Sequence, residues 1–389
     1  MKDRVAATIG LLGELVSFES LSLRTNLDIV AHIQAYLEGL GVEAVLSYGE
    51  DGERANLFAT IGPRIDGGVV LSGHTDVVPV DGQDWQTPPF TLVNREGRLF
   101  ARGSVDMKGF IACALAAVPM FQEADLKRPI HLAFTFDEET GSRGARVLSQ
   151  EMGGYPVKPA IAIVGEPTEM KIIVGHKGGY ELKTTVTGLE GHASDPSRGV
   201  NAIFFATRMI AHLEEVARNL AARPEPRSEF DPPFSTISVG TIAGGIARNV
   251  IAGTCVFDWE LRPVPGDEAD AILAGIEDYV REELRPQMQA ISPDADIVTV
   301  LEDAYPGLGT SEDAPAVALV RDLTGINSVG TVPFGTDAGY FDRAGMSTVV
   351  FGPGSIEQAH KPDEFIELSQ IEACQVFLEK LCARLCREA

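Results

Sequence analysis

The sequence predicts an α/β protein with a mainly parallel sheet, into which a smaller α+β domain is inserted. Up to about Gly175, short apolar segments alternate with helical patterns, which is typical of a parallel sheet covered by helices. Past Gly178 the pattern becomes a strict alternation of apolar and polar residues, as in 180–186, which indicates half-buried antiparallel strands. After about Tyr305 the first pattern returns. We therefore predict a discontinuous domain over 1–178 and 305–389, interrupted by an inserted domain over 179–304.

Apolar runs and helix-end signals place the elements of the larger domain. The helical spacing of Ile29, Ile33, Leu37 and Leu40 stops at Gly41, a residue that commonly ends helices. Further helices are expected at 107–121, 314–324 and 368–386. Strands are expected at 68–73, 130–136, 160–164 and 347–351.

The inserted domain is predicted to be an antiparallel sheet with two helices. Strands with alternating polarity are expected near 180–186, 235–242, 254–261 and 296–301. Helical patterns cover 201–221 and 268–283.

Composition excludes several classes of protein. The 32 basic and 56 acidic side chains give a formal net charge of −24, which disfavours nucleic acid and anionic membranes as partners. The N-terminal segment is amphipathic, and the longest apolar stretch, 109–121, is too short to span a bilayer. The cysteines are odd in number and form no Cys-x-x-Cys pair, which favours free thiols. We expect a cytoplasmic protein.

Histidines and carboxylates follow several of the predicted strands. His74 and Asp76 end the first, the acidic run 137–139 ends the second, and Glu166 follows the third. Asp106 precedes a predicted helix, and His360 follows the strand at 347–351. Because ligands of open α/β sheets bind at the carboxyl ends of strands, we expect these side chains to converge.

This set of residue types indicates a metal centre. Imidazole and carboxylate ligands suit Zn²⁺, and by the same logic Co²⁺ or Mn²⁺. Carboxylates gathered without metal would repel one another, so two ions fit the cluster better than one. Asp76 lies two residues from His74 along an extended chain, and we expect it to hold that imidazole in the correct tautomer.

Six segments resemble the metallopeptidase family that contains acetylornithine deacetylases, succinyl-diaminopimelate desuccinylases, aminoacylases and glutamate-releasing carboxypeptidases. The resemblance covers nearly the whole chain and implies a zinc-peptidase-like catalytic domain with an inserted lid. The segments are 72–79, 103–109, 137–141, 165–168, 191–196 and 358–364.

The resemblance implies a division of labour among the clustered residues. One ion would be held by His74, Asp106 and Glu166. The other would be held by Asp106, Glu139 and His360, so that Asp106 bridges the two. Glu138 would be the general acid/base, with Asp76 also in the catalytic group.

The resemblance also assigns residues of the inserted domain. This domain would form a homodimer and send His192 toward the partner's active site, where it would bind the developing oxyanion. Asn249 and Arg262 would lie near the substrate carboxylate, a group that the planar fork of arginine binds well. Lys177 and Thr336 are further expected substrate-binding residues.

Three segments favour the acetylornithine deacetylase branch of the family: 78–85, 176–178 and 351–360. The implied activity is removal of the acetyl group from N-acetyl-L-ornithine, a step of arginine biosynthesis. Asp337 is a departure, since these deacetylases often have Glu there. Three alternatives stay open: a desuccinylase or other N-acyl-amino-acid hydrolase, a dipeptidase or carboxypeptidase, and a non-catalytic metal-binding protein.

Overall fold

The computed structural model describes residues 1–222 and 230–387, and the chain divides into two compact units. The first unit comprises Met1–Gly175, Leu308–Val332 and Thr336–Ala389. The second comprises His176–Gly307 and Pro333–Gly335.

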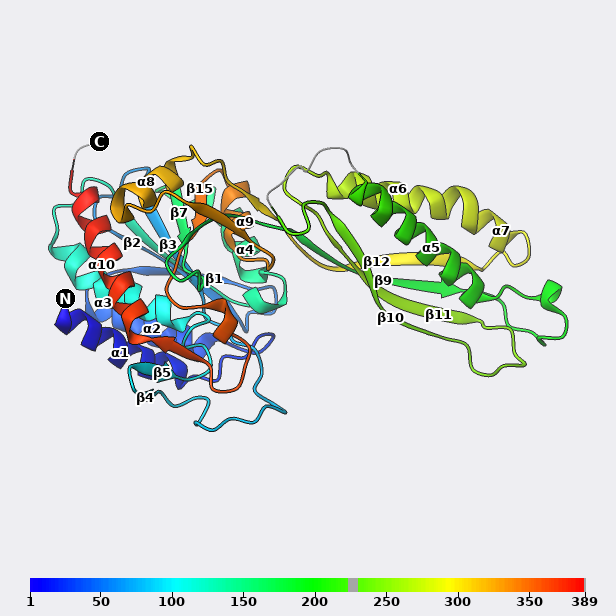
Figure 1. The fold of residues 1–389 in the computed structure, drawn as a ribbon, viewed down its shortest axis with the longest axis horizontal. Coiled ribbons are helices and arrows are strands. Elements are labelled where there is room, and N and C mark those ends of the chain that lie inside the picture. The colour runs from blue at the N-terminus through cyan, green and yellow to red at the C-terminus, as the bar shows by residue number, and fades with distance from the viewer. Residues whose placement is uncertain (223–229, 388–389) are drawn as a thin grey trace. The chain divides into compact units, whose positions relative to one another are not determined.

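A nine-stranded mixed sheet forms the centre of the first unit (Figure 1), in the order β1-β2-β6-β3-β7-β15-β8-β13, with β14 beside β8. Its four central strands, β6, β3, β7 and β15, are parallel, and the strands outside them pair antiparallel at β2 and β8. The predicted α/β class is therefore confirmed, although antiparallel pairings flank the parallel centre of the sheet. The strands are β1 (Ala44–Tyr48), β2 (Ala55–Ile61), β3 (Val69–His74), β6 (Ile130–Thr135), β7 (Ile161–Val164), β8 (Ile172–His176), β13 (Leu308–Gly309), β14 (Val329–Val332) and β15 (Ser347–Val350).

Helices cover both faces of this sheet because alternate strand residues point to opposite sides. Leu71 and Phe134 belong to the larger core, whereas their chain neighbours Val70 and Ala133 belong to the smaller one. The larger core packs against α1 (Lys2–Val16), α2 (Leu27–Gly39), α3 (Lys108–Glu123), α8 (Pro315–Thr324) and α10 (Leu368–Leu385). The smaller core packs against α4 (Arg143–Met152) and α9 (Ala338–Arg343).

A small antiparallel sheet, which the sequence pattern did not predict, lies at the side of the first unit. It consists of β4 (Val93–Arg95), β5 (Arg98–Phe100) and β16 (Phe365–Glu367), in the order β16-β5-β4. Phe365 pairs with Phe100, so the segments that follow β5 and precede β16 are neighbours.

The second unit is a four-stranded antiparallel sheet with helices packed against its core. Its strands, in spatial order, are β10 (Thr236–Gly244), β11 (Thr254–Arg262), β9 (Gly179–Thr187) and β12 (Asp296–Tyr305). Asn201 caps α5 (Ala202–Ala221) by accepting hydrogen bonds from the N–H groups of Ile203 and Phe204. The second predicted helix is interrupted: α6 (Ala269–Tyr279) continues through a π-helical turn (Val280–Leu284) into α7 (Arg285–Gln289).

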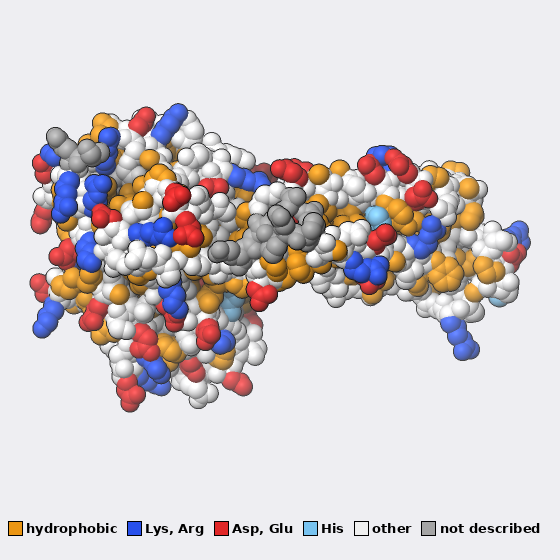
Figure 2. Space-filling model, turned by 45° about the horizontal axis from the view of Figure 1, so that its top comes forward, with side chains coloured by type: hydrophobic (Ala, Val, Ile, Leu, Met, Phe, Trp, Pro, Cys, Tyr) orange, Lys and Arg blue, Asp and Glu red, His pale blue; other side chains and the backbone are white. Residues whose placement is uncertain are grey.

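The surface matches the acidic composition. Figure 2 shows Asp and Glu side chains scattered among Lys and Arg over the face that it presents. Among the residues that the structure describes, no helix is both long and apolar enough to cross a bilayer.

Candidate metal centre

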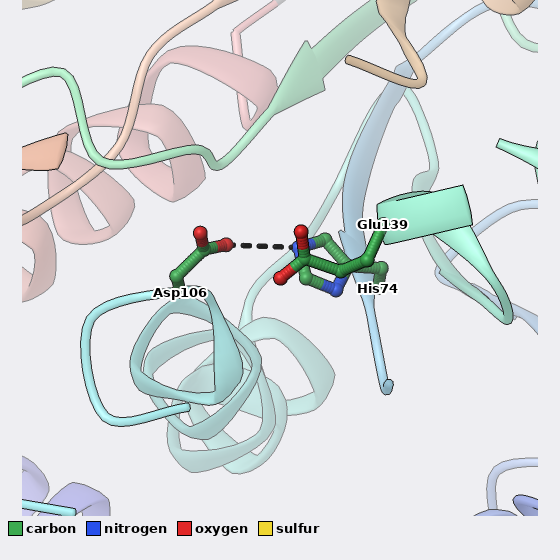
Figure 3. A group of neighbouring side chains, drawn as sticks. All are labelled: His74, Asp106 and Glu139. Carbon is green, nitrogen blue, oxygen red and sulfur yellow. Dashed lines mark hydrogen bonds and ion pairs between the residues drawn. The ribbon is translucent and has the colours of Figure 1, made fainter. Parts of the chain in front are cut away.

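The carboxyl ends of the central parallel strands bring four expected site residues to one edge of the sheet. His74 is the last residue of β3 and pairs with Thr135, the last residue of β6. A 3₁₀ turn at Glu138–Thr140 follows β6, and Glu166 follows β7 by two residues. Figure 3 shows His74 and Glu139 approaching Asp106, which comes from the turn before α3.

Asp106 lies between the two histidines. Its Oδ1 is 3.0 Å from Nε2 of His74, and its Oδ2 is 3.4 Å from Nε2 of His360. The carboxylate is almost fully buried, with 6% of the side chain exposed. One oxygen of Asp106 thus faces each histidine, which is the arrangement that a bridging ligand requires.

Glu139 and Glu166 complete the two halves of the cluster. Glu139 Oε2 lies 3.0 Å from Nε2 of His360, and Glu166 Oε1 lies 3.6 Å from Nε2 of His74. Glu138 Oε2 is 4.0 Å from the same nitrogen of His74. Adjacent Glu138 and Glu139 therefore lie closest to different histidines.

Asp76 supports the cluster through its main chain as well as its side chain. Nδ1 of His74 lies 2.9 Å from the main-chain oxygen of Asp76 but 3.6 Å from its carboxylate. Oδ1 and Oδ2 accept hydrogen bonds from the main-chain N–H groups of Glu138 and Glu139. The imidazole is thus oriented by the carbonyl of Asp76, and the carboxylate holds the turn that carries the two glutamates.

Without metal ions, burial and mutual repulsion disfavour the charged forms of the carboxylates in this cluster. Burial raises the pKa of Glu138 and Glu166 well above the ordinary value, and each is raised further by a neighbouring carboxylate. Hydrogen bonds to Asp106 and Glu139 raise the pKa of His360 to about 10. Bound cations would offset this repulsion between the carboxylates.

The donor set fits divalent metal ions. Ligand atoms of His74, Asp106 and Glu139 lie within 4.8 Å of one another, as do those of His74, Glu138 and Glu166. Oε1 of Glu166 is buried without a hydrogen-bond partner, a state that a bound cation would relieve. Nitrogen and oxygen ligands of these kinds suit Zn²⁺.

Four of the other expected residues lie in the second unit. His192 and Asn249 are neighbours there: His192 bridges to Val250, and the N–H of Ala193 donates to the main-chain oxygen of Asn249. Arg262 forms a two-bonded ion pair with Glu260, at 3.0 and 2.9 Å. Lys177 is buried and donates to the main-chain oxygen of Phe234.

Thr336, the remaining expected substrate-binding residue, lies in the first unit. It is fully buried, and its hydroxyl accepts a hydrogen bond from the N–H of Ala338 at the start of α9. This hydrogen bond holds Thr336 against the start of α9.

The structure adds three acidic residues to which sequence reasoning gave no role. Asp137 pairs with Arg54 and accepts a hydrogen bond from the N–H of Leu23. Asp337 accepts a hydrogen bond from Thr135, and burial raises its pKa to about 6. Glu364 is buried behind Asp106. Each carried a sequence signal: Asp137 begins the acidic run and a matching segment, Asp337 departs from the deacetylase pattern, and Glu364 ends a matching segment.

The parallel-centred sheet and the donor cluster at its carboxyl edge are features of a metal-dependent hydrolase. Residues 70–384 match the model of peptidase family M20/M25/M40, and the chain belongs to this family. It is a metal-dependent hydrolase that acts on amide bonds.

Relatives and solved structures resemble the chain over its whole length. It is 37% identical to the acetylornithine deacetylase of Myxococcus xanthus and 35% identical to that of Proteus mirabilis, covering 98–99% of each chain. The fold resembles aminopeptidase PepT of Bacillus cereus, with a TM-score of 0.76, 19% identity and coverage of 98% and 99%. It also resembles the YXEP protein of Bacillus subtilis, described as a dinuclear metal-binding peptidase, with a TM-score of 0.65, 16% identity and 99% coverage of both chains.

Proposed function

We propose that the chain removes the acetyl group from N-acetyl-L-ornithine, as a step of arginine biosynthesis. The observation that carries this proposal is the 37% identity, over 99% of both chains, to an acetylornithine deacetylase. The cluster of four largely buried carboxylates, buried His74 and half-exposed His360 supports the hydrolytic chemistry.

Two divalent ions, Zn²⁺ by preference and Co²⁺ as a substitute, would be held by five residues. His74, Asp106 and Glu166 would hold one ion, and Asp106, Glu139 and His360 the other. The distances from Asp106 to both histidines support its assignment as the shared ligand. When bound, the ions would polarise the amide carbonyl and lower the pKa of water.

Glu138 would move the proton of the reaction. It takes a proton from the attacking water as the carbon–oxygen bond forms, and gives it to the departing nitrogen as the carbon–nitrogen bond breaks. The products are acetate and an amino acid with a free α-amine. In the metal-free protein, burial and the charge of Glu166 raise the pKa of Glu138.

Residues of the second unit would bind the substrate. His192 is exposed. Its Nδ1 lies 2.7 Å from the hydroxyl of Ser194, so Nε2 is the ring nitrogen that would bind a ligand. We assign it to the oxyanion of the partner subunit's reaction. Asn249 and Arg262 would lie near the substrate carboxylate, which requires Arg262 to exchange Glu260 for substrate. Lys177 and Thr336 are further proposed substrate-binding residues.

A homodimer through the second unit is part of the proposal. The edge strand β10 is mostly exposed, and three large apolar residues near it or on α5 are exposed: Phe204, Ile242 and Ile246, at 63%, 51% and 79%. Unpaired strand edges and exposed apolar side chains favour association. Light scattering of the purified protein would measure the dimer directly.

A panel of substrates tests the proposed function. Metal-free protein is reconstituted with Zn²⁺ or Co²⁺ and assayed on N-acetylornithine, succinyl-diaminopimelate and acetylated neutral amino acids. The expected result is the highest kcat/KM on N-acetylornithine. A higher value on another substrate would replace the substrate assignment, and no metal-dependent turnover on any of them would favour a non-catalytic binding protein.

A further inference from the structure

A buried ion pair joins two loops of the candidate metal centre from behind. Arg102 Nη1 donates to Glu364 Oε2 over 2.7 Å, and each side chain is only 1% exposed. Arg102 lies in the turn that leads to Asp106, and Glu364 lies four residues beyond His360. Neither side chain belongs to the proposed ligand set or to the proposed proton transfer.

Glu364 holds the main chain of the Asp106 turn. Its Oε1 accepts hydrogen bonds from the N–H groups of Val105, at 2.9 Å, and Asp106, at 3.2 Å. Its main-chain oxygen accepts a further hydrogen bond from the N–H of Ala101. The two carboxylate oxygens are thus divided: one binds Arg102, and the other positions the residue proposed to bridge the ions.

Arg102 reaches the His360 loop directly and through Gln83. Its Nη1 lies 3.4 Å from the main-chain oxygen of Lys361, and its Nη2 donates to Oε1 of Gln83 over 2.7 Å. Nε2 of Gln83 then donates to the main-chain oxygen of His360 over 3.0 Å. The ring of Trp85 covers the guanidinium, with 5.1 Å from Cζ to the ring centroid.

The conformation of His360 makes this support necessary. Its φ of 61° lies in the left-handed region, which is unfavourable for a residue with a side chain. Such a conformation persists only where surrounding contacts hold it. A buried ion pair is by itself weak evidence for stability, because removing two charges from water offsets much of their attraction.

We propose that Glu364, Arg102 and Gln83 form a positioning network that sets Asp106 and His360 relative to each other for metal binding. The network acts on the ion that Asp106 and His360 share with Glu139 more than on the ion held by His74 and Glu166. This proposal rests on the ligand set given under the proposed function. Outer partners of metal ligands typically change affinity by roughly 10–100-fold when they are altered.

The test is Co²⁺ binding to the metal-free protein, followed by calorimetry and by the visible absorption of the bound ion. Glu364→Gln keeps the size of the side chain but leaves one acceptor oxygen, which can serve Arg102 or the two N–H groups but not both. We expect one of two Co²⁺ ions to bind about 10–100-fold more weakly, with an altered spectrum. Glu367→Gln is the matched control, because Glu367 pairs with Arg98 on the surface and contacts neither loop.

Gln83→Ala keeps the proposal testable if Glu364→Gln fails to fold. Gln83 is only partly buried, and its loss removes the hydrogen bond to the His360 carbonyl. We expect the same ion to be weakened, by a smaller factor. Wild-type affinity and spectrum in Gln83→Ala, or in a folded Glu364→Gln, would overturn the network. Fewer than two Co²⁺ ions on the unaltered protein would instead contradict the ligand set of the proposed function.

Discussion

Asp76 Oδ1 accepts a hydrogen bond from the main-chain N–H of Glu138 at a distance of 3.1 Å. The main-chain oxygen of the same aspartate lies 2.9 Å from Nδ1 of His74. A single buried residue therefore contacts both a proposed metal ligand and the turn that carries the proposed base.

Asp76→Asn is expected to lower kcat by about 10–100-fold, in the range seen for outer partners of catalytic groups. The amide has one acceptor oxygen in place of two, so the N–H groups of Glu138 and Glu139 compete for it. Steady-state kinetics with saturating metal measures the effect. Ser22→Ala removes only the hydroxyl that donates to Oδ2, and should cost less. If kcat fell equally in both variants, the hydrogen bonds from Glu138 and Glu139 to Asp76 would have no special role.

Glu138→Gln should retain both metal ions and lose most turnover. General-base catalysis contributes roughly 10² to 10⁴ in rate, and an amide cannot take the proton. Metal analysis and kcat on N-acetylornithine are the measurements. Glu139→Gln, the same substitution at the adjacent residue, is the control and should lose metal. If Glu138→Gln lost metal as well, its carboxylate would be a ligand and the division between the two glutamates would be wrong.

His192→Ala should lower kcat without changing the metal content. Because the proposal places His192 in the partner's site, mixing this variant with Glu138→Gln should restore part of the activity. The mixed dimer then contains one site with both an intact Glu138 and an intact His192. Activity that stays at the sum of the two separate variants would show that His192 acts within its own subunit or not at all.

Metal affinity should rise with pH from neutrality to about pH 10. Hydrogen bonds to Asp106 and Glu139 raise the pKa of His360 to about 10, so its imidazole carries a proton at pH 7 in the metal-free protein. An imidazole must lose its added proton to bind a metal ion, and binding therefore releases that proton. Calorimetry with Zn²⁺ in two buffers of different ionisation enthalpy counts the protons. Burial lowers the pKa of His131 to about 4, so His131→Asn should leave the count unchanged. A heat of binding independent of buffer would contradict the prediction.

Gly165→Ala should destabilise the first unit and disturb Glu166. A Cβ at Gly165 would lie 2.1 Å from the ring of Phe110, which is fully buried and cannot move away freely. Overpacking of this kind costs about 1–3 kcal/mol of unfolding free energy. Gly10→Ala, on the exposed face of α1 with open space around it, should instead stabilise by about 0.5–1 kcal/mol. Urea unfolding compares the two, and equal stabilities would exclude the packing explanation.

Much of the site could be predicted from the chain because each strand ends where its apolar run ends. His74 and the acidic run 137–139 follow such runs directly, and parallel strands bring their carboxyl ends to one edge. The antiparallel pairing at the edge of the sheet could not be predicted from the sequence. β1 and β2 carry no signal that distinguishes antiparallel from parallel pairing, since pairing depends on the neighbours that each strand finds.

The sequence by itself determined the α/β class and the cluster of histidines and carboxylates, because both depend on local periodicity and on the polar residues at the end of each strand. Only the tertiary structure decided which atoms meet: that the carbonyl of Asp76 faces His74, and that Glu364 lies behind Asp106. Glu364 is more than 250 residues from the N–H groups that it binds. Contacts over such separations arise from the pairing of β16 with β5, for which the sequence carries no short-range pattern.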